Sequence, residues 1–262
     1  AAKNDHYYDP ASGTYKGGFV INAEGEKEAI KGRSSFIMKK KVKVYPDTLC
    51  WLKDLTYAYN EPFVREYFSH IGYDNYPVVG VNWHQAQAFC NWRTQYFNSN
   101  AGVRVQAWRL PNEVEWEYAA RGGLSGAKYP WGGPYTRNKK GCFLANFKPL
   151  RGNYISDGGF TTVPVGTYEP NGFGLYDMAG NVAEWTGDAF DESAYQVTHD
   201  LSPYYQITAK KSDNKILKRK VIRGGSWKDI AYFMQCGVRT YEYADSARSF
   251  IGFRTVRTRI EY

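Results

Sequence analysis

The residues best suited to bind a ligand lie in the stretch 170–188, PNGFGLYDMAGNVAEWTGD. It combines three carboxylates with turn-forming Asn and Gly residues and with aromatic side chains. This composition is poor for a helix or a strand and typical of an ordered loop. Asp177 and Glu184 are seven residues apart, and the carbonyl groups of Gly180 and Val182 between them can turn toward the same point. Ca²⁺ prefers such oxygen ligands of mixed side-chain and backbone origin on a tight Gly turn.

Other interpretations of the chemistry-bearing residues are weaker or remain open. The same loop could be an Asx turn followed by a partly buried Trp185, without an ion. The four cysteines form no CxxC pair and neither demand nor exclude a disulfide, and the four histidines have no metal-ligand spacing. Ser226 follows two glycines but lacks the context of a nucleophile elbow and an evident His partner, so we interpret it as a turn residue.

Composition indicates a folded globular chain with an irregular interior. Of the 262 residues, 43% are hydrophobic and 17% aromatic, which is ample for a packed core. The formal charge of +8 suggests an anionic neighbour, but no recognition-helix or RNA-binding pattern accompanies the basic clusters at 39–43 and 210–220, so we expect no nucleic acid. We interpret these clusters as solvated faces. No segment reaches membrane-spanning length, and so the chain is either soluble or has lost a targeting segment.

Two amphipathic helices are predicted close together. The first follows Asn82, a natural N-cap, and the second follows Asn112 and ends at the Gly122-Gly123 pair. A short helix is expected near residues 61–68, started by Pro62. After residue 129 the chain is dense in Gly, Pro and aromatic residues, and no helical period follows for about sixty residues.

Strands are predicted at both ends of the chain. Residues 17–22 suggest a hairpin and residues 35–38 a second apolar run, while 221–227 indicates a strand that enters the core and ends at a Gly-Gly turn. Residues 250–257 alternate between apolar and basic side chains, as a final strand would. Arg239 and Arg248 lie between these segments and could be structural forks for buried carbonyls or ligands for an anion.

Five ordered blocks of the sequence resemble the formylglycine-generating enzyme family. They are RLPNEVEWEYAARGG (109–123), YPWGG (129–133), PNGFGLYDMAGNVAEW (170–185), VIRGGSW (221–227) and GFR (252–254). The resemblance covers roughly residues 77–258. It implies a single α+β domain with little regular secondary structure, similar to C-type-lectin-like folds, over residues 77–262. Residues 1–76 would then be an N-terminal extension packed on the core, and residues 189–220 an insertion.

Within the family, the segments that flank these blocks are most similar to the PorK/GldK lipoproteins of the type IX secretion and gliding motility machinery. Their second resemblance is to the paralogue GldJ. The flanks are VYPDTLCWLKDLTYAYNEP (44–62), YPVVGVNWHQAQAFCNWRT (76–94), GCFLANFKPLRGNY (141–154) and KRKVIRGGSWKDIAYFMQCGVRT (218–240). This resemblance implies an outer-membrane lipoprotein that faces the periplasm and forms a ring with a PorN/GldN-like partner. A signal peptide and a lipidated Cys are missing, so we expect a fragment without its N-terminus.

The family resemblance also implies two calcium sites. One set matches Asp177, Gly180, Val182 and Glu184, with Asp177 where the animal enzyme has Asn. The other set would comprise the Asn146 and Asp157 side chains with the Phe147 and Gly159 carbonyl groups. Both sets offer only oxygen ligands, as calcium requires.

Catalysis is where the sequence departs from the family. The enzymes hold copper(I) with two cysteines shortly after the GGS block, because thiolates suit this soft ion. Here Asp229 stands at the first position, and Met234, or Ala231 if the segment shifts, at the second. Cys236 matches a structural cysteine of the family, whose partner position is Ala119 or Ala120. We therefore expect no copper, no catalytic residues and no enzyme activity.

Two functions from different classes follow. The first is a non-catalytic structural subunit of the periplasmic ring of type IX secretion, bound to the PorN/GldN-like partner and to further copies of itself. The second is a calcium-dependent module that binds glycan or peptidoglycan. Aromatic and basic residues of the insertion are the partner-binding candidates, because aromatic side chains often dominate interfaces: Tyr195, Tyr204, Tyr205, Lys210 and Lys211. Deleting residues 190–215 is expected to leave a folded domain that no longer assembles.

Overall fold

The computed structural model forms two compact units, residues 1–43 and 44–262. It describes residues 42–56, 60–100, 102, 105–150, 153, 155, 159–197, 204–207, 209 and 212–258, and the backbone of four short strands before residue 30. No helix of this described part is both long and apolar enough to span a bilayer. Because the second unit begins at residue 44, the domain boundary expected between residues 76 and 77 falls inside that unit.

The first unit contains two antiparallel strand pairs. The strand β1 (Tyr7–Asp9) pairs with β2 (Thr14–Lys16), and β3 (Phe19–Ile21) pairs with β4 (Lys27–Ala29). Of the hairpin expected at residues 17–22, one strand, β3, lies within that range, and it pairs with β4 beyond it. The apolar run at residues 35–38 lies outside the described residues.

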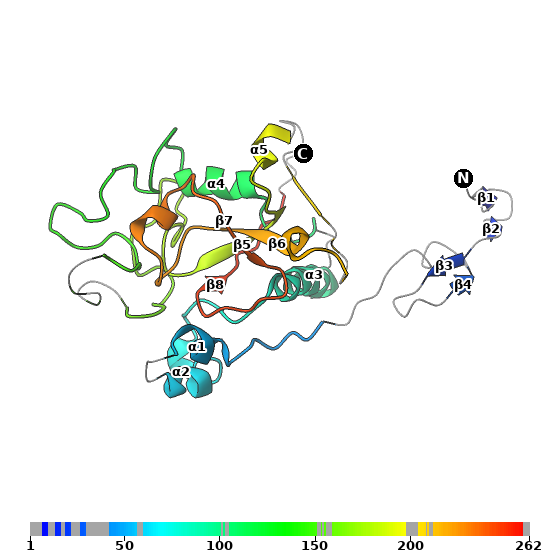
Figure 1. The fold of residues 1–262 in the computed structure, drawn as a ribbon, viewed down its shortest axis with the longest axis horizontal. Helices are drawn as coiled ribbons and strands as arrows, with labels where there is room; N and C mark the ends of the chain where they lie inside the picture. Colours follow the sequence, from blue (N-terminus) through cyan, green and yellow to red (C-terminus); the bar gives the residue numbers. More distant parts are fainter. Residues whose placement is uncertain are drawn as a thin grey trace. The chain divides into compact units, whose positions relative to one another are not determined.

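A four-stranded sheet of order β7-β6-β5-β8 is the centre of the second unit (Figure 1). Its strands are β5 (Ala183–Ala189), β6 (Arg219–Arg223), β7 (Thr240–Tyr243) and β8 (Ile251–Gly252). The strand β5 is antiparallel to β6 and parallel to β8, and β6 is antiparallel to β7. The β6 strand was predicted from its sequence. The expected last strand is much shorter than residues 250–257, and Val256 instead forms an isolated bridge with Arg109.

The strand β5 corrects the sequence analysis, which interpreted all of residues 170–188 as loop. Every residue of β5 is buried. A strand buried on both faces shows no polar–apolar alternation, and so its pattern resembles that of a loop when Glu184, Thr186 and Asp188 interrupt it. The loop proper ends at Val182, and Trp185 is completely buried rather than partly buried.

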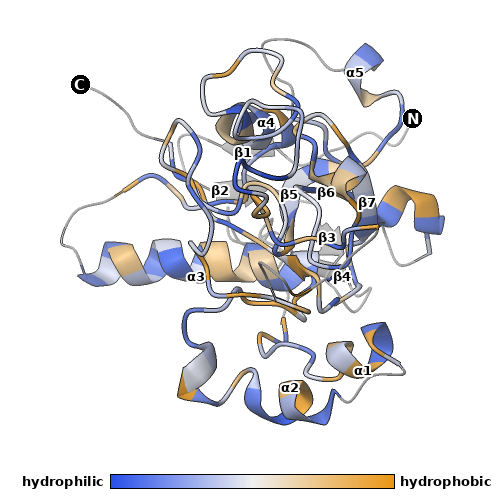
Figure 2. Cartoon of the chain, turned by 90° about the vertical axis from the view of Figure 1, so that its left-hand side faces the viewer, coloured by the Kyte–Doolittle hydropathy of each residue, from blue (hydrophilic) through white to orange (hydrophobic). Residues whose placement is uncertain are grey.

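The two predicted amphipathic helices form where their caps indicate. Helix α3 (Trp83–Asn100) begins after Asn82, whose side-chain oxygen accepts a hydrogen bond from the Gln85 amide at 2.9 Å. Helix α4 (Glu113–Arg121) begins with a full capping box between Asn112 and Glu115 and ends at Gly122 in the left-handed region. The two helices lie on opposite sides of the sheet in both views (Figures 1 and 2).

The remaining helices are short. They are α1 (Cys50–Asp54), α2 (Glu61–Glu66), which carries Pro62 in its first turn as expected, and α5 (Ala194–Val197), with single 3₁₀ turns at Ile71–Tyr73, Lys215–Lys218 and Ala231–Met234. From residue 129 to residue 182 the described chain has no helix or strand. The expected α+β class with little regular structure is therefore confirmed.

Residues 44–76 contribute to the main core. Trp51 is fully buried and stacks on Trp227, with ring centroids 6.2 Å apart. The Tyr67 hydroxyl donates to the Pro77 carbonyl at 2.6 Å, and its ring is buried in the same cluster as Ile251. This segment, assigned above to an extension, thus shares one hydrophobic core with the central sheet.

A buried ionic cluster joins α4 to the sheet. Arg223 is completely buried, lies 3.2 Å from Glu113 and donates to Glu117 and to the carbonyls of Val238 and Cys236. Arg239 donates to both Glu113 oxygens, at 2.6 and 2.7 Å. Arg239 is therefore a structural fork rather than an anion ligand, one of the two alternatives that the sequence left open.

This cluster predicts a position-dependent cost of replacing arginine by lysine. Arg223→Lys is expected to lower the free energy of unfolding by about 3 kcal/mol, because an ammonium group cannot reproduce the buried fork. Arg109→Lys is the control, because Arg109 pairs with Glu115 at a half-exposed site and should cost less than about 1 kcal/mol. Urea denaturation of both variants measures the difference, and equal costs would contradict this role of Arg223.

Candidate functional site

The loop that precedes β5 has a strained backbone and is fixed from two sides. Asp177 and Asn181 have positive φ angles of 54° and 62°. The Gly180 amide donates to Gly224 at 2.9 Å, and the Asn181 amide donates to the Asn146 carbonyl at 2.8 Å. A Cβ on Gly180 would lie 2.4 Å from that carbonyl oxygen, and so only glycine fits there. The loop therefore connects the two sets of residues that the sequence assigned to calcium.

Glu184, the first carboxylate of β5, is buried and already paired. Arg254 donates to its two oxygens at 2.5 and 2.6 Å, and the Trp116 indole N–H donates to Oε2 at 2.7 Å. The Arg254 guanidinium also donates to the Tyr176 carbonyl at 3.1 Å, beside Asp177. Glu184 thus ties α4, β5 and the segment after β8 together.

Asp177 lies close enough to Glu184 for the two charges to interact. Burial raises the pKa of Asp177, the neighbouring Glu184 raises it further, and the Gly166 amide and Arg254 oppose the shift. The Gly166 amide donates to Oδ2 at 2.8 Å. Within the described part of the chain, the other oxygen, Oδ1, accepts no hydrogen bond. A partly buried carboxylate in this state is stabilised by a nearby cation.

The Asp177 set therefore fits a hard cation in its donor chemistry. Asp177 supplies a carboxylate oxygen, and Gly180 and Val182 would supply carbonyl oxygens from the turn that follows it. Glu184 would share its charge between the ion and Arg254. A bound Ca²⁺ would offset the cost of burying Asp177 and fix the turn.

The second predicted set is only partly described. Asn146 is buried and donates from its amide to the Thr161 carbonyl at 2.7 Å. Phe147 and Gly159 line one cavity of about 430 Å³, but Asp157 lies outside the described residues. No cluster of three or more His, Cys, Asp or Glu side chains occurs in the described part of the chain, so any cation there relies on carbonyl and amide oxygens.

The segment after the Gly224-Gly225 turn is closed by a side-chain hydrogen bond. Ser226 is fully buried, and its hydroxyl donates to the Asp229 carboxyl at 2.6 Å. Burial raises the pKa of Asp229, although the bond from Ser226 opposes this. Met234 is also fully buried, in the same cluster as Tyr129. Ser226 is thus a turn residue, and the segment after it carries a partly buried carboxyl at Asp229 and a core thioether at Met234.

The four cysteines are not disulfide-bonded. Cys50 and Cys90 are in the main core, and Cys236 is in a separate cluster with Ala120, against which Ala119 packs. Cys236 thus shares a cluster with the two alanines at which the family resemblance puts the partner position. Burial raises the pKa of Cys50 to about 12 and those of Cys90 and Cys236 to about 11.

The partner-binding candidates are only partly exposed. Tyr195 is 57% exposed, and its ring lies 4.6 Å from the Arg239 guanidinium. Tyr204 is 42% exposed, and its ring lies on Gly187, where a Cβ would come within 2.7 Å. Tyr205 is half-buried. Lys210 and Lys211 lie outside the described residues.

The insertion is anchored to β5 through Asp188. The Tyr205 amide donates to Asp188 Oδ1 at 2.9 Å, and the Glu113 amide donates to Oδ2 at 2.6 Å. Phe190 packs on Tyr241, with ring centroids 4.8 Å apart. Deleting residues 190–215 would therefore leave a buried carboxylate without one of its donors, and single substitutions test the interface more cleanly.

Lys220 corrects the expectation that the whole basic run 210–220 is solvated. It is 5% exposed, and its ammonium group lies 4.1 Å from the centroid of the Trp83 ring. Burial lowers its pKa to about 8, while burial raises the pKa of nearby Asp188 to about 6. Lys220 belongs to β6, where it supports the sheet, and cannot attract a distant acidic partner.

Arg254 is the site residue that the sequence analysis missed. It was quoted only as part of the GFR block, while its bond to Glu184 joins residues 70 positions apart. Two features of the sequence could have indicated this pair. Arg254 directly follows the apolar segment 250–253, and Glu184 lies in the stretch 170–188, which was expected to bind a ligand. Such a pair is common for buried charges, but sequence spacing does not reveal its members.

A family profile described as the sulfatase-modifying factor enzyme 1-like domain matches residues 31–259. The chain belongs to this family. The match takes in residues 44–76, which share the core described above. Together with the observed architecture, it confirms the family and the fold that the ordered sequence blocks predicted.

Relatives in the sulfatase-modifying factor family include active and inactive proteins. The chain is 35% identical over 189 residues to the formylglycine-generating enzyme of Streptomyces coelicolor, covering 70% of this chain and 53% of that protein. It is 35% identical over 185 residues to the inactive C-alpha-formylglycine-generating enzyme 2 of Bos taurus, covering 68% and 49%. The chain thus spans about half the length of these curated relatives. PvdO from Pseudomonas aeruginosa has a similar structure, with a TM-score of 0.55, 27% identity and coverage of 70% and 62%.

Calcium is expected to stabilise the chain through Asp177. A ligand that binds only the folded state adds about 2.7 kcal/mol at a hundredfold excess over its Kd, so the melting temperature in CaCl₂ should exceed that in EGTA. Asp177→Ala should abolish this difference, while Asp74→Ala, which removes an exposed carboxylate, should preserve it. Differential scanning calorimetry on metal-free protein measures both. An unchanged melting temperature in the unsubstituted chain would mean that hydrogen bonds alone hold the loop.

Proposed function

We propose that this chain is a non-catalytic member of its family that acts by binding, as a structural subunit of a cell-envelope secretion ring. The observation that carries the proposal is the hydrogen bond between Ser226 and Asp229. It holds a partly buried carboxyl at the position where the resembled enzymes have a copper-binding cysteine. A carboxylate is a poor ligand for copper(I), which prefers thiolates. Inactive relatives in cattle and mice offer a precedent for loss of activity in this family.

The remaining thiols support the same proposal. Cys50, Cys90 and Cys236 are buried with raised pKa values, and a thiol in this state is protonated and unreactive at neutral pH. Cys142 is exposed but belongs to another segment of the chain. The oxidation of a substrate cysteine requires a pair of accessible thiolates, and these four residues do not provide one.

The specific ring is proposed from the flanking segments. Residues 44–62 and 218–240 resemble the PorK/GldK lipoproteins, and this resemblance supports a subunit at the periplasmic face of the outer membrane, anchored by a lipid outside this chain. Its partner would be the PorN/GldN-like ring protein, and further copies of the chain would complete the ring. The exposed Tyr195 and the half-exposed Tyr204 are the described candidates for this contact.

A calcium-dependent module for glycan or peptidoglycan is the alternative, favoured by aromatic rings beside the Asp177 loop. Tyr118 is 67% exposed and contacts Phe173, with ring centroids 5.4 Å apart, and Tyr176 precedes Asp177 and is also exposed. Such rings can stack on sugars. Sedimentation with purified peptidoglycan in the presence of CaCl₂ or EGTA separates the two functions, because only the alternative predicts calcium-dependent co-sedimentation.

Catalytic silence is the first consequence to test. Incubation with copper(I), oxygen and a sulfatase-type cysteine peptide should leave the peptide unchanged, because no thiolate pair is available to hold the metal. Mass spectrometry of the peptide detects the aldehyde, and an active formylglycine-generating enzyme provides the positive control. Aldehyde above the level of a protein-free reaction would overturn the non-catalytic assignment.

Partner binding is the second consequence of the proposed function to test. The double variant Tyr195→Ser and Tyr204→Ser should bind the PorN/GldN-like protein at least about tenfold more weakly, since aromatic residues supply much of the affinity of an interface. Tyr135→Ser removes a tyrosine that is 76% exposed elsewhere and should bind as the unsubstituted chain does. Surface-based affinity measurements compare the three. If the double variant keeps full affinity and its melting transition, the insertion is not the interface.

A further inference from the structure

Helix α3 has a second apolar face that the described residues of the domain leave uncovered. Ala86 and Cys90 are buried in the main core, as expected for an amphipathic helix. The side that carries Phe89, Trp92 and Tyr96 is apolar too, and these rings are 40%, 54% and 58% exposed. The apolar bands recur along the helix in Figure 2. A helix that is apolar on more than one side is normally covered on each of them.

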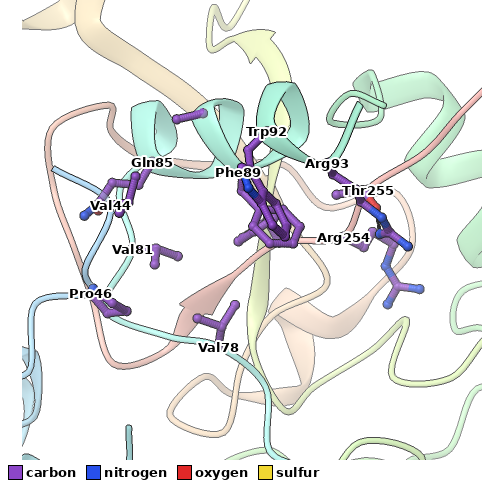
Figure 3. Close-up of a pocket in the computed structure, with 12 residues that line it drawn as sticks. Val44, Pro46, Val78, Val81, Gln85, Phe89, Trp92, Arg93, Arg254 and Thr255 are labelled. Atoms are coloured by element: carbon purple, nitrogen blue, oxygen red, sulfur yellow. Dashed lines mark hydrogen bonds between the residues drawn. The ribbon is translucent and has the colours of Figure 1, made fainter. Parts of the chain in front are cut away.

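This second face forms one wall of a groove. The groove has a volume of about 860 Å³ and is lined mainly by apolar side chains. Phe89 and Trp92 extend from α3 into the space (Figure 3), which is bounded on its other sides by Val44, Pro46, Val78, Val81 and Phe253. The Phe89 ring lies 5.4 Å from both Trp92 and Phe253, and Trp92 stacks on Tyr96 at 5.3 Å. The aromatic rings therefore form one continuous surface.

Positive charge flanks the aromatic surface. The Arg93 and Arg257 guanidinium groups lie 3.9 and 5.2 Å from the Trp108 ring centroid. Arg93 also donates to the Thr255 hydroxyl at 2.6 Å, but neither arginine has a carboxylate partner among the described residues. No Asp or Glu lines the groove. An occupant that brings carboxylates would complement these charges.

We propose that this groove binds an amphipathic helix of a partner protein, with its apolar face on Phe89, Trp92 and Tyr96 and with carboxylates beside Arg93 and Arg257. The aromatic positions at 89, 92 and 96 cover two turns of α3, which is the scale on which helix-in-groove partners place their i, i+3 or i+4, and i+7 anchors. A concave apolar site suits an inserted helix, whereas a flat bilayer would not fill it. The inference does not depend on the ring assignment or on the insertion carrying Tyr195.

The binding test uses two labelled peptides of about 15 residues, roughly four helical turns. Both carry Leu at i, i+3 or i+4, and i+7, and the flanking positions are Glu in one and Lys in the other. The Glu peptide should bind the full chain at least about tenfold more tightly by fluorescence anisotropy, and its affinity should fall with added salt. Equal affinities, or no binding of either peptide, would overturn the proposal.

Substitutions locate the site and separate its two components. Trp92→Gln should lower the affinity for the Glu peptide at least about tenfold. The control Tyr135→Gln, which removes an exposed aromatic ring elsewhere, should leave this affinity unchanged. Arg257→Gln should reduce the preference for Glu over Lys, because the Glu peptide then binds more weakly and the Lys peptide does not. Melting curves confirm that each variant is folded. Full binding by a folded Trp92→Gln variant would place the peptide elsewhere.

Photo-crosslinking identifies the occupant. The full chain with p-benzoylphenylalanine at position 92 is irradiated with the Glu peptide, and separately with vesicles of phosphatidylglycerol and phosphatidylcholine. Adducts on the peptide, mapped by mass spectrometry, support the proposal. Dominant adducts on residues 1–43 of the same chain, on a second copy, or on lipid would assign the groove to that occupant instead and overturn it.

Discussion

The structure depends on the burial of two carboxylates in the central strand β5. A carboxylate removed from water is strongly destabilised unless donors or positive charge surround it. Glu184 is satisfied by Trp116 and Arg254, and Asp188 by the amides of Glu113 and Tyr205. These four partners come from α4, from the segment after β8 and from the insertion. One strand therefore holds together segments that are far apart in the sequence.

The same constraint shapes the loop before β5. Because Glu184 is fixed by Arg254, the preceding turn has to reach it through Gly180 and Asn181 in left-handed conformations, and this brings Asp177 beside Glu184. A second charge in this position favours a cation, and calcium is therefore a consistent completion of the loop. The segment after Gly225 differs, because the Asp229 carboxyl there accepts a hydrogen bond from the Ser226 hydroxyl of the same segment. The first site offers oxygen donors that suit a hard ion, whereas the second carries a carboxyl bonded to a hydroxyl.

The sequence predicted those elements whose signals are local. Asn82 and Asn112 marked the starts of α3 and α4 because a cap acts within three residues, and the Gly-Gly pair marked the end of β6 for a similar reason. The ordered blocks predicted the family. The strand β5 was missed because burial on both faces removes alternation, and Lys220 was misjudged because its neighbours Trp83 and Asp188 are distant in sequence. Ion pairs such as Arg239 with Glu113 join residues 126 positions apart, and no local pattern specifies them.

The proposed non-catalytic role requires that this fold work without the metal chemistry of its enzyme relatives. A copper(I) titration against a competing chelator under anaerobic conditions tests this most directly, and we expect no high-affinity copper(I) site. Any weak binding should disappear in Cys142→Ser, because Cys142 carries the exposed thiol. A tight site of one copper(I) per chain that persists in Cys142→Ser would contradict it, since two buried thiols would then have to ionise and meet.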